Sequence, residues 1–213
     1  MTLTRDVPLD PTQSALLFID VQNFAAHREG GEFADLSEAA FDEKYGWFFA
    51  ELDARVIPNM QAIQRAARAA RMEVMYTTIE SLTHDGRDRS LDYKITGFHV
   101  PKGSWDGKVI DQIAPVGDEI VLPKTSSSVF ISTHIDYVLR NLGVRQLVIS
   151  GLVTDQCVES AIRDACDLGY LVTQVTDACL TYTPERHDHS LRTIKGYCRQ
   201  VTTADLVTEL GGA

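Results

Sequence analysis

Short apolar runs alternate with amphipathic stretches along almost the whole chain, and this alternation limits the possible folds more than any other feature. Nearly continuous apolar runs are typical of strands that are buried on both faces of a parallel sheet. Six runs are expected to be strands: Ser14 to Ile19, Met72 to Ile79, Glu119 to Leu122, Gln146 to Ser150, Tyr170 to Val175 and Tyr197 to Thr202. Six stretches are expected to be helices: Asp53 to Arg71, Asp106 to Ile113, Ser132 to Leu142, Asp155 to Leu168, Glu185 to Lys195 and Ala204 to Leu210.

Repeated strand, helix, strand units favour one architecture. Right-handed crossovers make consecutive strands parallel and place helices on both faces of the sheet. The sequence therefore predicts an α/β fold, a three-layer doubly wound (Rossmann-like) sheet of about six parallel strands. Gly143 and Gly169 stand just past two predicted helices, where a left-handed cap is needed. Because the 213 residues contain no repeat and no low-complexity linker, we expect a single domain over residues 1–213.

The charge balance and the first residues limit the expected partners and location. Twenty basic against thirty acidic residues give a formal net charge of −10, the wrong sign for a protein that neutralises phosphates. We therefore expect neither nucleic acid nor an anionic membrane as a partner. The first twenty residues lack the pattern of a secretory signal, and no uncharged apolar run is as long as a bilayer span. These observations predict a cytoplasmic protein.

Two long stretches, residues 23–52 and 80–104, interrupt the alternation of strands and helices. Long connections in compact domains are often lids or walls of a binding site, although they are also found as plain surface excursions. We expect these two stretches to lie over the functional site.

Three reactive residues stand at or just after the ends of predicted strands. Asp20 ends the SALLFID run, Lys124 follows EIVL, and Cys157 follows QLVIS in the segment GLVTDQC. Ligands of open parallel sheets bind beyond the carboxyl ends of the strands, so an acid, a base and a thiol are expected to meet there. Taken singly, Asp20 could be only a turn residue, Lys124 a solvated charge and Cys157 a small core residue.

The position of Cys157 favours a reactive thiol. Thr154 is a candidate N-cap of the predicted Asp155 to Leu168 helix, which would place the thiol in the first turn, where the helix dipole favours thiolate. The other cysteines, Cys166, Cys179 and Cys198, fit packing positions better. No CxxC spacing occurs, so neither a disulfide framework nor a zinc knuckle is expected.

Three segments carry a resemblance to a known family. LLFIDVQNFA, VLPKTSSSVF and GLVTDQCVESAIRDACDLGYLVTQVTDAC resemble the isochorismatase-like cysteine hydrolases, which include nicotinamidase, N-carbamoylsarcosine amidohydrolase, ureidoacrylate amidohydrolase and biuret hydrolase. The similarity runs from about Ser14 to Leu206. It implies a six-stranded parallel sheet, a homo-oligomer such as a dimer or tetramer, and a catalytic triad of Asp20, Lys124 and Cys157. It also implies a cis peptide bond between Leu152 and Val153, with the amides of Val153 and Cys157 forming an oxyanion hole.

Departures from the family pattern narrow the expected activity. Nicotinamidases carry a metal site built from Asp-x-His and a second His, whereas only His84 lies in the matching stretch YTTIESLTHDGRDRS. We therefore expect no catalytic metal and no cofactor, and we interpret His187, Asp188 and His189 as solvated surface residues. Family members that hydrolyse a vinyl ether lack the cysteine, so Cys157 favours hydrolysis of a carbon–nitrogen bond in a small amide or ureido substrate.

The substrate itself is less constrained by the sequence. Candidates for substrate binding are Asn23, Phe24, Glu80, Trp105 and Gln200, each of which could also be a packing residue. Two other functions stay open: a non-catalytic ligand-binding or regulatory protein on the same fold, and a serine hydrolase that uses one of the serines 126–128 beside Lys124. Neither GxGxxG nor GxxxxGK[ST] occurs, which argues against nucleotide binding.

Overall fold

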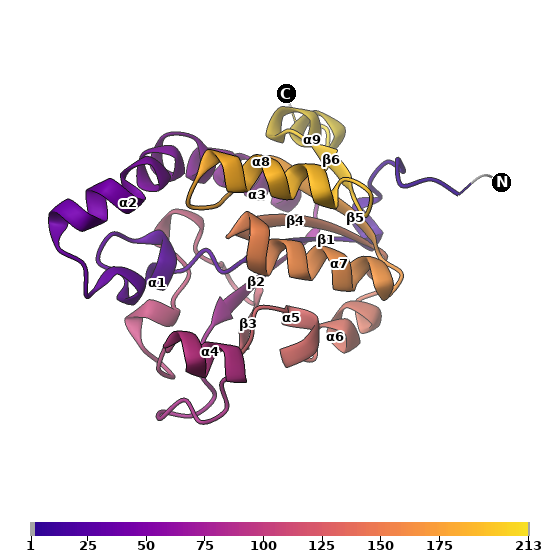
Figure 1. The fold of residues 1–213 in the computed structure, drawn as a ribbon. Helices are drawn as coiled ribbons and strands as arrows, with labels where there is room; N and C mark the ends of the chain where they lie inside the picture. Colours follow the sequence, from indigo (N-terminus) through magenta and orange to yellow (C-terminus); the bar gives the residue numbers. More distant parts are fainter. Residues whose placement is uncertain (1–2, 213) are drawn as a thin grey trace.

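The computed structural model describes residues 3–212 and contains one sheet of six parallel strands, in the order β3-β2-β1-β4-β5-β6 (Figure 1). The strands are β1 (Ser14–Ile19), β2 (Glu73–Ile79), β3 (Ile120–Lys124), β4 (Gln146–Leu152), β5 (Leu171–Leu180) and β6 (Arg199–Val201). Helices flank the sheet, so the predicted α/β fold is confirmed, with every predicted strand present.

The apolar run of β1 explains its central place in the sheet. All six residues of β1 are buried, and the strand pairs with β2 on one edge and with β4 on the other. At the edge of the sheet, β3 contains Pro123 and the partly exposed Val121. Proline cannot donate to a ladder, so it is tolerated on an edge strand.

Side chains that alternate along β1 build two separate cores. Leu16 and Phe18 face a core that includes Met60 and Ile63 of α3 (Ile57–Ala69) and Leu206 of α9 (Thr203–Glu209). Leu17 and Ile19 face the opposite core, together with Leu139 of α6 (Ile135–Asn141) and Ile162 of α7 (Glu159–Asp167). These helices form the two outer layers, which lie above and below the sheet in Figure 1. The remaining helices are α1 (Asn23–Ala26), α2 (Glu38–Glu51), α4 (Leu91–Thr96), α5 (Val129–Ser132) and α8 (Pro184–Ile194).

Two of the predicted helices are wrong in part or entirely. Residues 106–113 form only short 3-10 turns, because this segment pairs with the backbone after β1: the Ile110 amide donates to the Val21 carbonyl, and the Asn23 amide to the Lys108 carbonyl. The stretch 132–142 is divided between α5 and α6, because Thr133 is extended, with φ −138° and ψ 177°. The predicted left-handed caps are confirmed, with φ of 76° at Gly143 and 92° at Gly169.

The stretch 23–52 is more regular than a loop. It contains α1 and α2, and α2 continues through the π-helical turn Leu52–Val56 into α3. Buried aromatic side chains of α2, Phe41, Tyr45, Phe48 and Phe49, pack with Phe33 and Tyr182. Within residues 3–212, no helix combines the length and the apolar content that crossing a bilayer requires.

The strand order reverses between β1 and β4. The chain moves outward from β1 to β2 and β3 on one side, and from β4 to β5 and β6 on the other. Crossovers that leave in opposite directions open a crevice at the carboxyl ends of the two central strands. Asp20 directly follows β1, and the segment that carries Cys157 directly follows β4.

Candidate active site

Asp20, Lys124 and Cys157 meet at this crevice, as the sequence predicted. The Lys124 Nζ atom lies 2.8 Å from Asp20 Oδ2 and 3.3 Å from Cys157 Sγ. All three residues are buried, with exposed fractions of 3%, 0% and 5% for Asp20, Lys124 and Cys157. Burying a charge is costly unless an opposite charge pairs with it. The ion pair therefore allows Lys124 and Asp20 to be buried beside the thiol.

Asp20 is held by the strands on which it lies. Its amide donates to the Thr77 carbonyl of β2, and the Thr77 hydroxyl donates to Asp20 Oδ1 at 2.9 Å. Its φ of 53° is in the left-handed region, which aspartate tolerates better than most residues. One carboxylate oxygen is therefore fixed by Thr77, and the other is directed to Lys124.

Lys124 is the last residue of β3, and polar groups of the protein surround its ammonium group. Besides Asp20 and Cys157, its Nζ atom donates to the Ser126 carbonyl at 2.8 Å and lies 3.4 Å from the hydroxyl of Tyr93. Burial lowers the pKa of Lys124, but the carboxylate of Asp20 outweighs burial, so the pKa stands above its ordinary value. The lysine is therefore a permanent cation next to the thiol.

The backbone before Cys157 turns sharply at the end of β4. Gly151 has a φ of 141°, and an added Cβ atom would stand 2.2 Å from the carbonyl oxygen of Ile19. Only glycine therefore allows β4 to pass β1 so closely. The peptide bond between Leu152 and Val153, shortly after this glycine, is cis, as the resemblance implied.

The expected capping role of Thr154 is wrong. Cys157 lies in a π-helical turn, Thr154–Val158, that precedes α7, and the residue at the N-cap position is Val153. The Thr154 hydroxyl instead forms a hydrogen bond with Nδ1 of His187, 2.9 Å away. His187 is therefore half-buried and engaged, whereas its neighbours Asp188 and His189 are exposed, as expected for the surface of a helix.

The electrostatics of the thiol also differ from the sequence-based expectation of a favoured thiolate. Burial raises the pKa of Cys157 to about 12; Lys124 lowers it, and the negative charge of Asp20 raises it. Loss of solvent outweighs the single cation because that cation is already paired with a carboxylate. Cys157 is therefore a neutral thiol in the resting site, and it needs a base when it reacts.

We expect the alkylation of Cys157 by iodoacetamide to increase about tenfold per pH unit from pH 7 to about pH 10, because only the thiolate reacts. Lys124→Met should lower the rate further at each pH, since the cation that favours thiolate is lost. The rate at Cys157 is followed by peptide mass spectrometry. A plateau below about pH 8 would show that the thiol is ionised at neutrality and would contradict this prediction.

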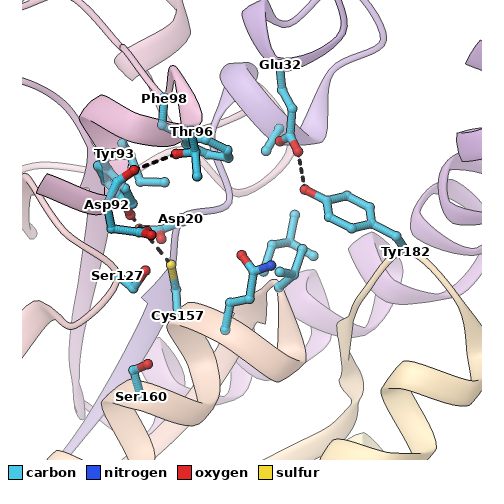
Figure 2. Close-up of a pocket in the computed structure, with 15 residues that line it drawn as sticks. Asp20, Glu32, Asp92, Tyr93, Thr96, Phe98, Ser127, Cys157, Ser160 and Tyr182 are labelled. Atoms are coloured by element: carbon cyan, nitrogen blue, oxygen red, sulfur yellow. Dashed lines mark hydrogen bonds between the residues drawn. The ribbon is translucent and has the colours of Figure 1, made fainter. Parts of the chain in front are cut away.

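A cavity of about 390 Å³ opens above the thiol (Figure 2). Asp20, Tyr93, Ser127 and Cys157 lie together in this view, and the Tyr93 hydroxyl is 3.9 Å from Cys157 Sγ. Glu32 and Tyr182 face each other across the cavity from this group. The other lining residues are Ala25, Ile79, Asp92, Thr96, Phe98, Leu152, Val153, Gln156 and Ser160. Both long stretches therefore contribute walls, through Ala25 and Glu32 and through Asp92 to Phe98.

None of the five expected substrate-binding residues lines this cavity. Asn23 and Glu80 are engaged with the backbone: the Asn23 amide donates to the Trp105 carbonyl, and Glu80 accepts from the amide of Gly103. Phe24 packs edge-on against Phe98, and Trp105 packs edge-on against His27. Gln200 lies on β6, where its amide donates to Gln174 and to the Leu191 carbonyl.

Several cavity residues were missed by the sequence analysis. Tyr93 has the clearest signal, because it lies in the long stretch 80–104 that was expected to cover the site; its side chain is only 4% exposed. Glu32 and Tyr182 lie 150 residues apart in the chain, and no spacing pattern connects them. Among the described residues, no group of three or more His, Cys, Asp or Glu side chains is arranged to hold a metal ion.

The surroundings of Glu32 disfavour its ionised form. Burial raises its pKa to about 7, although a hydrogen bond from Tyr182 and the charge of Lys44 lower it. Its Oε1 atom accepts from the Tyr182 hydroxyl, and its buried Oε2 atom has no hydrogen-bond partner within residues 3–212. Ionised Glu32 therefore costs the folded protein stability.

Glu32→Gln should therefore stabilise the protein at alkaline pH by about 3 kcal/mol. A raised pKa means that stability is present below the ordinary value of 4.5 and is lost as the pH rises to about 7. The gain in free energy of unfolding should thus be near zero at about pH 4.5 and complete at about pH 8. Urea denaturation of both proteins across this range tests the prediction. An equal gain at every pH would assign it to packing and not to charge.

Comparisons with known proteins agree with the fold. The family model described as the Isochorismatase domain matches residues 14–205. A cysteine hydrolase from Pseudomonas syringae pv. phaseolicola 1448A is similar with a TM-score of 0.78 and 24% identity, covering 96% of this chain and 95% of the other. N-carbamoylsarcosine amidase from Thermoplasma acidophilum is similar with a TM-score of 0.65 and 25% identity, covering 90% and 96%.

The chain is a doubly wound α/β protein with a buried thiol at the switch point of its sheet. The matched region spans most of the chain, so the protein belongs to the isochorismatase family, and it is a hydrolase of that family.

Proposed function

We propose that the protein is a metal-independent cysteine amidohydrolase that cleaves a carbon–nitrogen bond of a small amide or ureido compound. The observation that carries the proposal is the contact of Cys157 Sγ with Lys124 Nζ at 3.3 Å, beside the ion pair of Lys124 and Asp20. A thiol with an adjacent base and cation is suited to acyl transfer. The cavity of about 390 Å³ admits a small substrate.

In the first half of the reaction, the Cys157 sulfur attacks the substrate carbonyl carbon while Asp20 accepts the thiol proton. This role for Asp20 follows from the raised pKa of Cys157, because a neutral thiol must lose its proton as it attacks. The carbon–nitrogen bond then breaks, and the leaving nitrogen takes the proton from Asp20. Ammonia or an amine departs, and the acyl group remains on sulfur as a thioester.

The negative charge that develops on the carbonyl oxygen needs donors. We assign this role to the amides of Val153 and Cys157, at the turn that follows the cis bond Leu152–Val153. Fixed backbone donors stabilise such an oxyanion without reorganisation. Lys124 adds a positive charge on the sulfur side of the reacting centre.

In the second half, water attacks the thioester while Asp20 accepts one of its protons. The intermediate collapses, the carbon–sulfur bond breaks, and the proton returns from Asp20 to the Cys157 sulfur. The products are a carboxylic or carbamic acid and the free thiol. Each proton that Asp20 accepts is returned within the cycle, so no other reagent is consumed besides water.

A panel of small amides and ureido compounds tests the proposal. Release of ammonia or amine is measured with biuret, N-carbamoylglycine, N-carbamoylglycinamide, nicotinamide and maleamate, in each case beside the Cys157→Ser variant. Rapid acid quenching followed by mass spectrometry should reveal an acyl adduct on Cys157 during turnover. Turnover without any adduct, and of equal rate in the variant, would replace this mechanism by a non-covalent one. Binding without turnover of any compound would favour a ligand-binding protein.

A further inference from the structure

The cavity above Cys157 is lined by acidic groups and by no basic one. Its charged lining residues in the described part of the chain are Asp20, Glu32 and Asp92. Lys124 is fully buried beneath the thiol and does not line the cavity. The cavity also has apolar lining residues: Ala25, Ile79, Phe98, Leu152 and Val153. A substrate carboxylate would meet no cation on these walls.

Besides Lys124, the cations Arg186 and Lys44 lie near the cavity-lining residues Tyr182 and Glu32, but each is engaged outside the cavity. The Arg186 Nε atom is 2.6 Å from Asp155 Oδ2, and its guanidinium lies over the ring of Tyr182, 5.4 Å from the centroid. Lys44 lies over the ring of Tyr45, 5.1 Å from its centroid. Neither residue lines the cavity. The net charge of −10 further disfavours an anion here.

The Glu32 side chain lines the side of the cavity away from the thiol (Figure 2). The Tyr182 hydroxyl occupies Oε1 and thereby orients the carboxyl group, while the buried Oε2 atom has no partner in the described chain. A buried polar atom without a partner is costly unless a ligand satisfies it. The chemical complement of this atom is an N–H or ammonium donor.

We propose, on the basis of the function proposed above, that the substrate is a neutral or cationic amide or ureido compound without a carboxylate, and that its distal N–H group binds Glu32. Glu32 is then a specificity-determining residue, and Tyr182 is the positioning residue that orients it. The carbonyl that Cys157 attacks and the donor that Glu32 accepts are the two ends of one small molecule.

Three ligands that share one carbamoyl end test the proposal. N-carbamoylglycine is anionic, N-carbamoylglycinamide is neutral, and 2-aminoethylurea is cationic. Binding is measured by calorimetry to the Cys157→Ala protein at about pH 8.5, where Glu32 is ionised and no turnover occurs. The amide and the amine should each bind at least about tenfold more tightly than the carboxylate. Equal or tighter binding of N-carbamoylglycine, or no binding of the other two, overturns the proposal.

Variants in the same Cys157→Ala background assign the selectivity to Glu32. Glu32→Gln should reduce the preference for 2-aminoethylurea over N-carbamoylglycine about tenfold or more, whereas the matched exposed change Glu29→Gln should leave it unchanged. Tyr182→Phe, which keeps the ring, should weaken the preference by a smaller factor. An unchanged preference in Glu32→Gln overturns the role of Glu32. Because these measurements need no nucleophile, they stand apart from the adduct and turnover tests of the proposed reaction.

Discussion

Cys157→Ser is expected to reduce turnover by more than about 1,000-fold while the protein stays folded and still binds its substrate. The hydroxyl is close to the thiol in size, so the buried contact with Lys124 is kept. An alcohol is a far weaker acid than a thiol, however, and the same burial that raises the pKa of Cys157 to about 12 would hold a serine neutral. The measurement is steady-state turnover together with ligand binding and thermal unfolding.

Cys166→Ser is the matched control for this change. Cys166 is half-buried, lies outside the cavity, and donates to the Tyr197 carbonyl, which a serine hydroxyl can also do. It should retain wild-type turnover. If Cys157→Ser keeps more than about a tenth of the wild-type rate, the sulfur is not the nucleophile and the covalent mechanism is wrong.

The sheet could be predicted well because the residues of each strand alone indicate whether that strand is buried. A strand with both faces buried is apolar at every position, so SALLFI gave the bounds of β1 without error. β5 extends five residues beyond its predicted end, because Thr176 and Asp177 interrupt the apolar pattern. Those polar residues form hydrogen bonds elsewhere: Thr176 donates to the Val201 carbonyl, and Asp177 Oδ1 accepts from the backbone amide and the hydroxyl of Thr203.

The helices were harder to predict where tertiary contacts compete with local periodicity. Residues 106–113 have a helical pattern, but their backbone groups pair with residues 21–23 instead. The helix α2, by contrast, was not predicted, although its apolar residues have a helical spacing. Phe41, Tyr45, Phe48 and Leu52 recur at helical spacing, and all are buried. These aromatic residues pack in a core with Phe33 and Tyr182.

The candidate site has a chemical half, formed by Asp20, Lys124 and Cys157, and a substrate half, formed by the rest of the cavity lining. The first could be predicted from the sequence and the second could not. The chemical half was predictable because parallel strands end at one edge, which brings Asp20, Lys124 and Cys157 together whatever the loops do. The substrate half depends on how the loops pack against one another. Glu32 and Tyr182 meet only because α2 packs its aromatic face against the loop after β5, and no local pattern encodes that contact.

The ion pair of Asp20 and Lys124 allows a second large effect to be predicted, on both activity and stability. Asp20→Asn should lower turnover at least about 100-fold, because an amide cannot carry the proton between sulfur and the leaving nitrogen. It should also destabilise the fold by about 3–5 kcal/mol, since Lys124 would be left as a fully buried cation without its carboxylate. Turnover and the free energy of unfolding are measured on the same preparation.

The double variant Asp20→Asn with Lys124→Met separates the two roles of the pair. Replacing both charges removes the uncompensated cation, so most of the lost stability should return. Turnover should stay low, because neither the proton carrier nor the cation beside Cys157 has been restored. If stability and turnover recover together, neither charge is needed for the reaction, and Asp20→Asn lowers turnover only through the lost stability of the fold. If turnover stays lost in a protein of restored stability, the low rate of Asp20→Asn does not come from unfolding, and the charged pair is needed for the reaction itself, as the transfer of the Cys157 proton to Asp20 requires.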